Sequence, residues 1–279
     1  MKTITTIADT QSLAESFRRE GKRIGFVPTM GFLHEGHLSL MRRARDENDI
    51  VVVSIFVNPT QFGPKEDLDR YPRDAEGDRN KCESTGADIL FTPGVKEMYP
   101  EKPEVFVTVE DVSDRLEGAI RPGHFRGVAT VVAKLFHIVK PHRAYFGQKD
   151  FQQCAVIRRM VKGLNLDVDV AVLPTVREPD GLAMSSRNSY LNADERRAAT
   201  VLFRALSTAR TLFLEGTKTP EKLKKTAKRI IEEEPEMIVD YVEIVDRETL
   251  AQVTTPGREM TLLVAAKIGK TRLIDNIML

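Results

Sequence analysis

The first part of the chain alternates short apolar runs with longer amphipathic segments. Residues 24–27 and 50–57 are almost wholly apolar, which is typical of strands that are buried on both faces. Strands that alternate with helices predict an α/β fold, with a Rossmann-like parallel sheet and helices on both faces. The other elements expected here are strands at 88–91, 144–146 and 168–173, and helices at 37–48, 127–140 and 151–162.

The pattern changes near residues 174–181, and no further nucleotide-type loop follows. Asn192 and Glu195 suit the two ends of a capping box that opens a long helix. A Lys/Glu-rich helix is expected at about 220–234, and strands are expected at 239–245 and 261–266. These elements predict a smaller α+β domain at the C-terminal end.

A chain of 279 residues is long enough to bury a sizeable core and to divide into two domains. We expect a Rossmann-like, ligand-binding domain over residues 1–176. A smaller α+β domain over residues 177–279 is expected to close over it as a lid.

Composition and charge limit the classes of partner and the cellular location that fit the chain. The chain has 42 basic and 41 acidic residues, so no net field attracts it to nucleic acid or to a membrane. Its two cysteines, Cys82 and Cys154, are far apart and fit neither a disulfide framework nor a metal cluster. The first residues lack the apolar core of a signal peptide, and no stretch approaches a membrane span. We therefore expect a cytoplasmic location.

A loop after the first apolar run carries two histidines, His34 and His37, directly before the expected helix. At such a corner the backbone N–H groups and the helix dipole favour an anion, so the pair indicates a nucleotide triphosphate site. A zinc site and a purely structural role are the alternatives. The metalloprotease pattern, however, places its histidines at i and i+4, whereas these stand at i and i+3 with no obvious third ligand.

Two further loops carry groups that suit phosphate oxygens. Lys149 follows Gly147 after an expected strand, and it can offer a point charge to a phosphate. Ser185, Ser186 and Arg187 combine two hydroxyls with a guanidinium, close to the expected domain boundary. Taken alone, each segment also fits an ordinary polar turn.

Amides stand at the end of the most apolar strand and beyond the Lys149 loop. Asn58 and Gln61 follow the strand at 50–57, and buried amides require partners, so they suit hydroxyls and a carboxylate. Either Gln152 or Gln153 is expected to point into the same cleft. The basic, glycine-bearing loop at 121–127 fits either a cleft wall or a subunit contact.

Together, these motifs resemble the pantothenate synthetase (pantoate–β-alanine ligase) family from one end of the chain to the other. The histidine loop alone marks only the wider nucleotidyltransferase group, which includes class I aminoacyl-tRNA synthetases. The glutamine-bearing segments are far more specific. The matching segments are PTMGFLHEGH, VVSIFVNPTQF, RPGHFRGVATVV, YFGQKDFQQ, GLAMSSRNSYL and the terminal RLIDN.

The resemblance implies an ATP-dependent condensation of pantoate with β-alanine through a pantoyl adenylate, with release of AMP and pyrophosphate. It implies that His37, with His34 beside it and Lys149, serves the adenylation step, and that Gln61, Gln153 and Asn58 hold pantoate and β-alanine. It places ATP on Met30, Gly31, Phe32, Leu33, His34, Glu35, Gly36 and His37, on Gly147, Gln148, Lys149 and Asp150, at Val176, and on Met184, Ser185, Ser186 and Arg187.

The family also implies Mg²⁺ travelling with the phosphates, whose protein ligands stay unknown, and a homodimer. Another small-molecule nucleotidyltransferase of the same fold is the alternative enzyme, although it would not need the paired glutamines. A nucleotide-binding regulatory protein with an inactive site is the non-enzyme alternative, but every expected donor is present.

Overall fold

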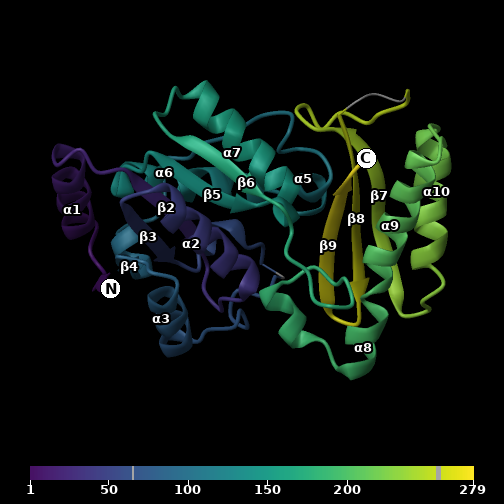
Figure 1. The fold of residues 1–279 in the computed structure, drawn as a ribbon, viewed down its shortest axis with the longest axis horizontal. Coiled ribbons are helices and arrows are strands. Elements are labelled where there is room, and N and C mark those ends of the chain that lie inside the picture. Colours follow the sequence, from purple (N-terminus) through teal and green to yellow (C-terminus); the bar gives the residue numbers. More distant parts are fainter. Residues whose placement is uncertain (65, 256–258) are drawn as a thin grey trace. The chain divides into compact units, whose positions relative to one another are not determined.

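The computed structural model describes residues 1–64, 66–255 and 259–279, which form two compact units (Figure 1). The first unit contains Met1–Gly147 and Gln152–Pro174, and the second contains Gln148–Phe151 and Thr175–Leu279. The domain boundary expected after residue 176 stays a prediction. The hydrophobic pattern gave no sign that the short segment Gln148–Phe151 belongs to the second unit.

The first unit is built on six parallel strands: β1 (Lys2–Ile4), β2 (Ile24–Thr29), β3 (Ile50–Ile55), β4 (Ile89–Phe91), β5 (Arg143–Gly147) and β6 (Asp169–Leu173). Their order is β1-β4-β3-β2-β5-β6, so the chain leaves β2 toward one edge through β3 and later returns to its other side with β5. Ligands of open α/β sheets bind beyond the carboxyl ends of the strands at such a reversal. The predicted parallel sheet is confirmed.

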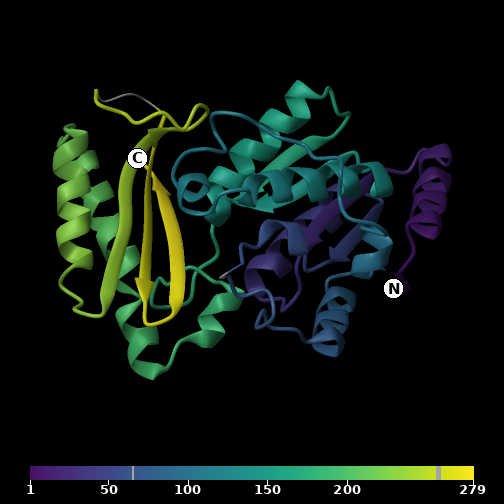
Figure 2. The ribbon, with the colours of Figure 1, turned by 180° about the vertical axis from the view of Figure 1, so that it is seen from behind.

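Helices cover both faces of this sheet (Figures 1 and 2): α1 (Ile7–Arg19), α2 (Glu35–Glu47), α3 (Ala75–Ser84), α4 (Val95–Met98), α5 (Glu117–Ile120), α6 (His124–Val139) and α7 (Phe151–Gly163). Val27 joins the core cluster with Met41 of α2, whereas the ring of Phe26 meets Phe136 of α6 edge-on at 6.4 Å. Because successive strand residues face opposite sides, α2 and α6 lie on opposite faces.

The second unit contains an antiparallel sheet in the order β7-β8-β9, made of β7 (Met237–Asp246), β8 (Met260–Ile268) and β9 (Thr271–Met278). Its helices are α8 (Ala193–Ala198), α9 (Val201–Leu214) and α10 (Pro220–Ile231). Leu206 of α9 and Leu223 of α10 are fully buried in one core with Leu262 of β8. The predicted smaller α+β fold is therefore present (Figure 2).

Several elements differ from the expected ones. The long helix expected after Asn192 is interrupted between α8 and α9, although the capping box of Asn192 and Glu195 is present. The third strand, β9, was not expected, because two consecutive polar residues, Asp275 and Asn276, interrupt its apolar pattern. Likewise β1 and α1 were not expected, since β1 is three residues long and α1 buries only Thr10 and Ala14.

Candidate active site

Three neighbouring strands of the first unit, β3, β2 and β5, end in the segments that the sequence singled out. The histidine loop (residues 30–37) follows β2, and a 3₁₀ turn, η1 (Pro59–Gln61), follows β3. Gly147 is the last residue of β5. The fold therefore brings the histidine loop, the η1 turn and Gly147 to one edge of the sheet, at the point where the strand order reverses.

The second and third residues of the histidine loop, Gly31 and Phe32, lie in the left-handed region. Gly31 has φ +86° and Phe32 has φ +49°, a conformation that is costly for a residue with a side chain. The Gly31 N–H donates to Thr29 Oγ1 at 3.2 Å, and that hydroxyl donates to the Ser54 carbonyl at 2.8 Å. The end of β3 thus fixes the start of the loop.

A carboxylate from α3 holds the next two residues. Asp78 is 2% exposed, and its two oxygens accept the N–H groups of Phe32 and Leu33, each at 2.7 Å. Lys81, one helical turn further along α3, donates its Nζ to the Leu33 carbonyl at 2.9 Å. The sequence analysis missed both residues, because a buried aspartate in a polar helix carries no pattern that separates it from an exposed one.

His34 and His37 cap α2 through their rings. The Gly36 N–H donates to His34 Nδ1 at 3.2 Å, and the His34 N–H donates to His37 Nδ1 at 3.3 Å. The ring centroids lie 4.1 Å apart. An Nδ1 that accepts a hydrogen bond carries no proton, so both neutral rings hold their hydrogen on Nε2. Each ring therefore has an Nε2–H donor at the N-terminus of a helix, where an anion is favoured.

The η1 turn fixes the amide of Gln61. Asn58 is 1% exposed, and its Nδ2 donates to Gln61 Oε1 at 3.1 Å and to the Gly127 carbonyl at 3.2 Å. Asn58 Oδ1 accepts from the hydroxyl of Tyr99 at 3.0 Å. The Gln61 Nε2 consequently points the other way, and it lies 3.2 Å from the sulfur of Met30, the first residue of the histidine loop.

The segment 121–127, expected from the sequence to be a basic loop, packs against the same turn, and its last four residues form the start of α6. Glu66 forms a bidentate pair with Arg121, whose Nη1 lies 3.1 Å from His124 Nε2. The other ring nitrogen of His124 lies 2.8 Å from the Gln61 carbonyl, so it must be the donor. A Cβ on Gly127 would lie 2.3 Å from the Thr60 carbonyl, so only glycine fits there. Within the first unit, this segment supports the η1 turn.

Of the two glutamines at the start of α7, Gln152 is committed to the fold. Its Nε2 donates to the carbonyls of Val112 and Arg115, and its Oε1 accepts the Glu117 N–H. Gln152 is 3% exposed, whereas Gln153 is partly exposed. Only Gln153 therefore stays a candidate for substrate.

The second unit contains the other predicted site residues. Lys149 lies in the 3₁₀ turn η2 (Gln148–Asp150), with its side chain 19% exposed. The Met184 N–H donates to the Val176 carbonyl at 3.0 Å, which joins those two segments. Ser185 caps η3 (Ser186–Tyr190), since its hydroxyl accepts the Arg187 N–H at 3.3 Å.

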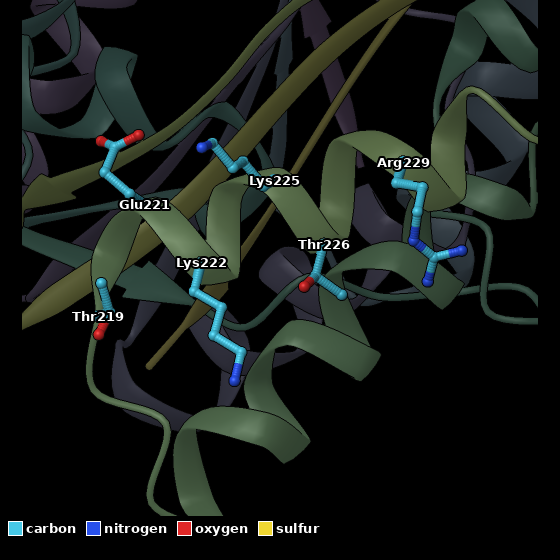
Figure 3. Close-up of a pocket in the computed structure, with 6 residues that line it drawn as sticks. All are labelled: Thr219, Glu221, Lys222, Lys225, Thr226 and Arg229. Carbon is cyan, nitrogen blue, oxygen red and sulfur yellow. The ribbon is translucent and has the colours of Figure 1, made fainter.

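A surface hollow in the second unit is lined by threonine and charged side chains. It follows the exposed side of α10, as Figure 3 shows, and none of its residues belongs to the predicted site. The hollow is lined by Thr219, Glu221, Lys222, Lys225, Thr226 and Arg229.

Among the described residues, no three His, Cys, Asp or Glu side chains are grouped so that they could hold a metal ion. No helix in the described part of the chain is long and apolar enough to cross a membrane.

The parallel sheet, with a histidine loop at the end of one of its two central strands, is the arrangement expected of a nucleotide-binding α/β enzyme. A family model described as pantoate-beta-alanine ligase matches residues 2–278. The chain belongs to the pantoate–β-alanine ligase family. It is accordingly an enzyme that joins pantoate to β-alanine with ATP as co-substrate.

Individual relatives agree with this family. A pantothenate synthetase from Thermotoga petrophila is 56% identical over 279 residues, which cover 100% of both chains. One from Geobacter sulfurreducens is 54% identical and covers 100% of this chain and 99% of its own.

Solved structures of the family have the same fold. A pantothenate synthetase from Thermus thermophilus has a TM-score of 0.94 at 48% identity, with 99% of each chain covered. A pantoate–β-alanine ligase from Francisella tularensis, complexed with "beta-gamma ATP" and β-alanine, has a TM-score of 0.82 at 34% identity. That comparison covers 100% of this chain and 97% of the other.

The contacts of His124 predict a dependence of stability on pH. Burial, together with the neighbouring Arg121 guanidinium, lowers the pKa of His124 from 6.5 to about 4. Between these values the unfolded chain takes up a proton that the folded chain does not. The free energy of unfolding should therefore fall as the pH drops from 6.5 toward 4, by up to about 3 kcal/mol from this group.

His124→Asn isolates this contribution, since the amide nitrogen can still donate to the Gln61 carbonyl but does not titrate. Denaturant unfolding at pH 7 and pH 4.5 should show a smaller acid loss for this variant than for the unsubstituted enzyme. The exposed His137→Asn on α6 is the control for the substitution itself. Equal acid losses in all three proteins would contradict the buried, neutral state of His124.

Proposed function

We propose that the adenylation step takes place at the loop of His34 and His37. In this step the pantoate carboxylate attacks the α-phosphorus of ATP, the bond to the bridging oxygen breaks, and pyrophosphate leaves. The amine of β-alanine then attacks the carbonyl of the pantoyl adenylate and displaces AMP. The observation that carries the proposal is that a backbone N–H at the N-terminus of α2 donates to Nδ1 of each ring, which assigns the hydrogen of each neutral ring to Nε2.

Charge develops on the phosphate oxygens during this attack, so rigid donors lower its barrier more than mobile ones. His34 and His37 are rigid because each ring accepts a backbone N–H within the loop. We assign His37 to the reacting α-phosphate, by donation from Nε2, and His34 to a neighbouring phosphate oxygen. The remaining ATP contacts of this loop are its backbone and side chains at residues 30–33, 35 and 36.

Gln61 is the proposed donor to the pantoate carboxylate or hydroxyls. Asn58 occupies its oxygen, so the amide presents its nitrogen, and that nitrogen lies beside Met30 of the ATP loop. Asn58 itself has partners for both amide atoms inside the protein. We therefore revise its role from a direct contact with substrate to the residue that orients Gln61. Gln153 is proposed as the second pantoate ligand.

The second unit supplies further ATP contacts in this proposal. Lys149 offers a cation to the phosphates, with Gly147, Gln148 and Asp150 as its neighbours in the chain. The backbone of Val176 and the segment from Met184 through Ser185 and Ser186 to Arg187 complete the set. The predicted role of residues 177–279 as a lid belongs to the same proposal.

The proposal also includes a metal ion, a cellular location and an oligomeric state. Mg²⁺ would accompany the ATP phosphates, as is usual for a cation that keeps several waters and takes few protein ligands. A cytoplasmic location agrees with two buried cysteines, Cys82 and Cys154, that both carry free thiols. The homodimer follows from the resemblance to the family alone.

Replacing His37 tests the adenylation role. His37→Asn keeps an oxygen able to accept the His34 N–H, so the cap is retained while the Nε2–H donor is lost. We expect ATP–pyrophosphate exchange in the presence of pantoate to fall by about two to four orders of magnitude, as for the loss of one positioned donor or acid.

The exposed His137→Asn is the matched control and should exchange at the normal rate. Near-normal exchange by His37→Asn would remove His37 from the chemistry. Exchange that proceeds equally well without pantoate in the unsubstituted enzyme would overturn the assignment of pantoate as the acid that is adenylated.

Replacing Gln61 tests the pantoate site. Gln61→Ala removes one donor to a charged or polar substrate group, which corresponds to roughly a 10- to 100-fold loss of affinity. The KM for pantoate should rise by that factor, while the KM for ATP changes by less than about threefold. Steady-state kinetics with each substrate varied in turn would check this, with Gln11→Ala on α1 as the control. Equal rises in both KM values would count against a pantoate site at η1.

A further inference from the structure

The terminal strand β9 contains two consecutive buried polar residues to which the ligase reaction as described assigns no role. Asp275 is 3% exposed and Asn276 is 2% exposed, and both lie between apolar pairs of the strand, Leu273 and Ile274 before them and Ile277 and Met278 after them. Burial of polar groups is costly unless each is hydrogen-bonded. Their partners therefore indicate what the pair does.

Asn276 holds the turn that contains Lys149. Its Nδ2 donates to two consecutive carbonyls, those of Gln148 at 2.9 Å and of Lys149 at 3.0 Å. Its Oδ1 accepts from Gln148 Nε2 at 3.1 Å. All three bonds lie within the second unit. One side chain thereby fixes the backbone from which the Lys149 side chain extends.

Asp275 holds the other proposed ATP segment of this unit. Its two oxygens accept from Arg177, at 2.6 Å from Nη1 and 2.9 Å from Nη2. The Arg177 guanidinium also stacks over the Phe203 ring, with 4.2 Å to the centroid. Arg177 pairs with Ala183 in an isolated β-bridge, next to the bond between Met184 and Val176. The arginine thus fixes the two bridged segments, around Arg177 and Ala183, of which the second leads to Ser185.

The two polar residues are also joined to each other. The Asn276 N–H donates to Asp275 Oδ1 at 2.7 Å, so the carboxylate that binds Arg177 also contacts the backbone of its neighbour. Because strand β9 pairs with β8 along its length, neither residue can shift alone. The turn of Lys149 and the bridged segments of Val176 and Met184 are consequently fixed to one strand.

We propose that Asn276 and Asp275 are positioning residues for the adenylation step, and that Asn276 acts through the placement of Lys149. This inference rests on the proposed role of Lys149 with ATP. Neither side chain touches substrate. Each sets the backbone of a segment that does, and small displacements of such groups lower rates strongly.

A double-mutant cycle separates positioning from a merely structural role. The four enzymes are the unsubstituted chain, Asn276→Ala, Lys149→Ala and the double variant. We expect Asn276→Ala to raise the KM for ATP about tenfold, with the KM for pantoate changed less than twofold. In the Lys149→Ala background the same substitution should change the KM for ATP less than twofold, because residues that act as a unit are not additive.

Two further variants keep the result interpretable. Asn276→Asp preserves the shape but turns both donor bonds into oxygen–oxygen contacts, so it should reproduce the loss for ATP in a folded protein. Thr261→Val is the matched control, since Thr261 is fully buried in β8 and its hydroxyl has no hydrogen-bond partner among the described residues. It should leave both KM values unchanged.

Each outcome has one meaning. Equal effects of Asn276→Ala with and without Lys149, or equal effects on the KM values for ATP and pantoate, would make the role structural and overturn the inference. If Asn276→Ala and Asn276→Asp both leave the KM for ATP unchanged while Lys149→Ala raises it, the inference about Asn276 is overturned but the proposed role of Lys149 is not. No effect of Lys149→Ala would overturn the proposed role of Lys149 with ATP, and the inference with it.

Discussion

The bonds from Asp78 to the backbone N–H groups of Phe32 and Leu33 determine the shape of the histidine loop. Gly31 and Phe32 occupy the left-handed region, and without further contacts the loop would readily adopt other backbone conformations. A buried carboxylate with two short, charge-assisted bonds compensates that cost. Since His34 caps α2 only when the preceding backbone turns in this way, the position of both imidazoles depends on an aspartate in a different helix.

The same arrangement recurs at each proposed substrate segment. Asn58 orients the Gln61 amide, His124 binds the carbonyl of that residue, and Asn276 binds the carbonyls around Lys149. In every case a buried or partly buried polar side chain fixes the backbone or the amide of a residue that is proposed to meet substrate. The parallel sheet brings the loops of the first unit to one edge, and these side chains then set their conformation. An enzyme that must hold ATP and an acid for in-line attack requires this rigidity.

The parallel sheet was predictable because β2 and β3, the two strands at its centre, are apolar runs, and His34, His37 and Gln61 were found because they lie shortly after these runs. Asp78 was not predictable, since its partner Phe32 lies 46 residues away and its own helix is mostly polar. Asn276 was not predictable for a different reason. Together with Asp275 it interrupts the apolar pattern of β9, so that pattern did not predict a strand there, whereas the patterns of β7 and β8 did. Local patterns identify the residues proposed to meet substrate, whereas those that hold them depend on long-range hydrogen bonds that only the fold displays.

The most direct test of this account is the rate of pantoate-dependent ATP–pyrophosphate exchange in Asp78→Asn compared with Asp74→Asn. Both changes replace a carboxylate by an amide, Asp78 within α3 and Asp74 at its N-cap, but Asp74 only accepts the Gly77 N–H of the helix, and asparagine caps equally well. In Asp78→Asn an amide nitrogen must face a loop N–H. We expect exchange to fall about 100-fold in Asp78→Asn, as for the misplacement of catalytic groups, and to stay normal in Asp74→Asn. Equal rates in the two variants would contradict the claim that Asp78 sets the position of the histidines.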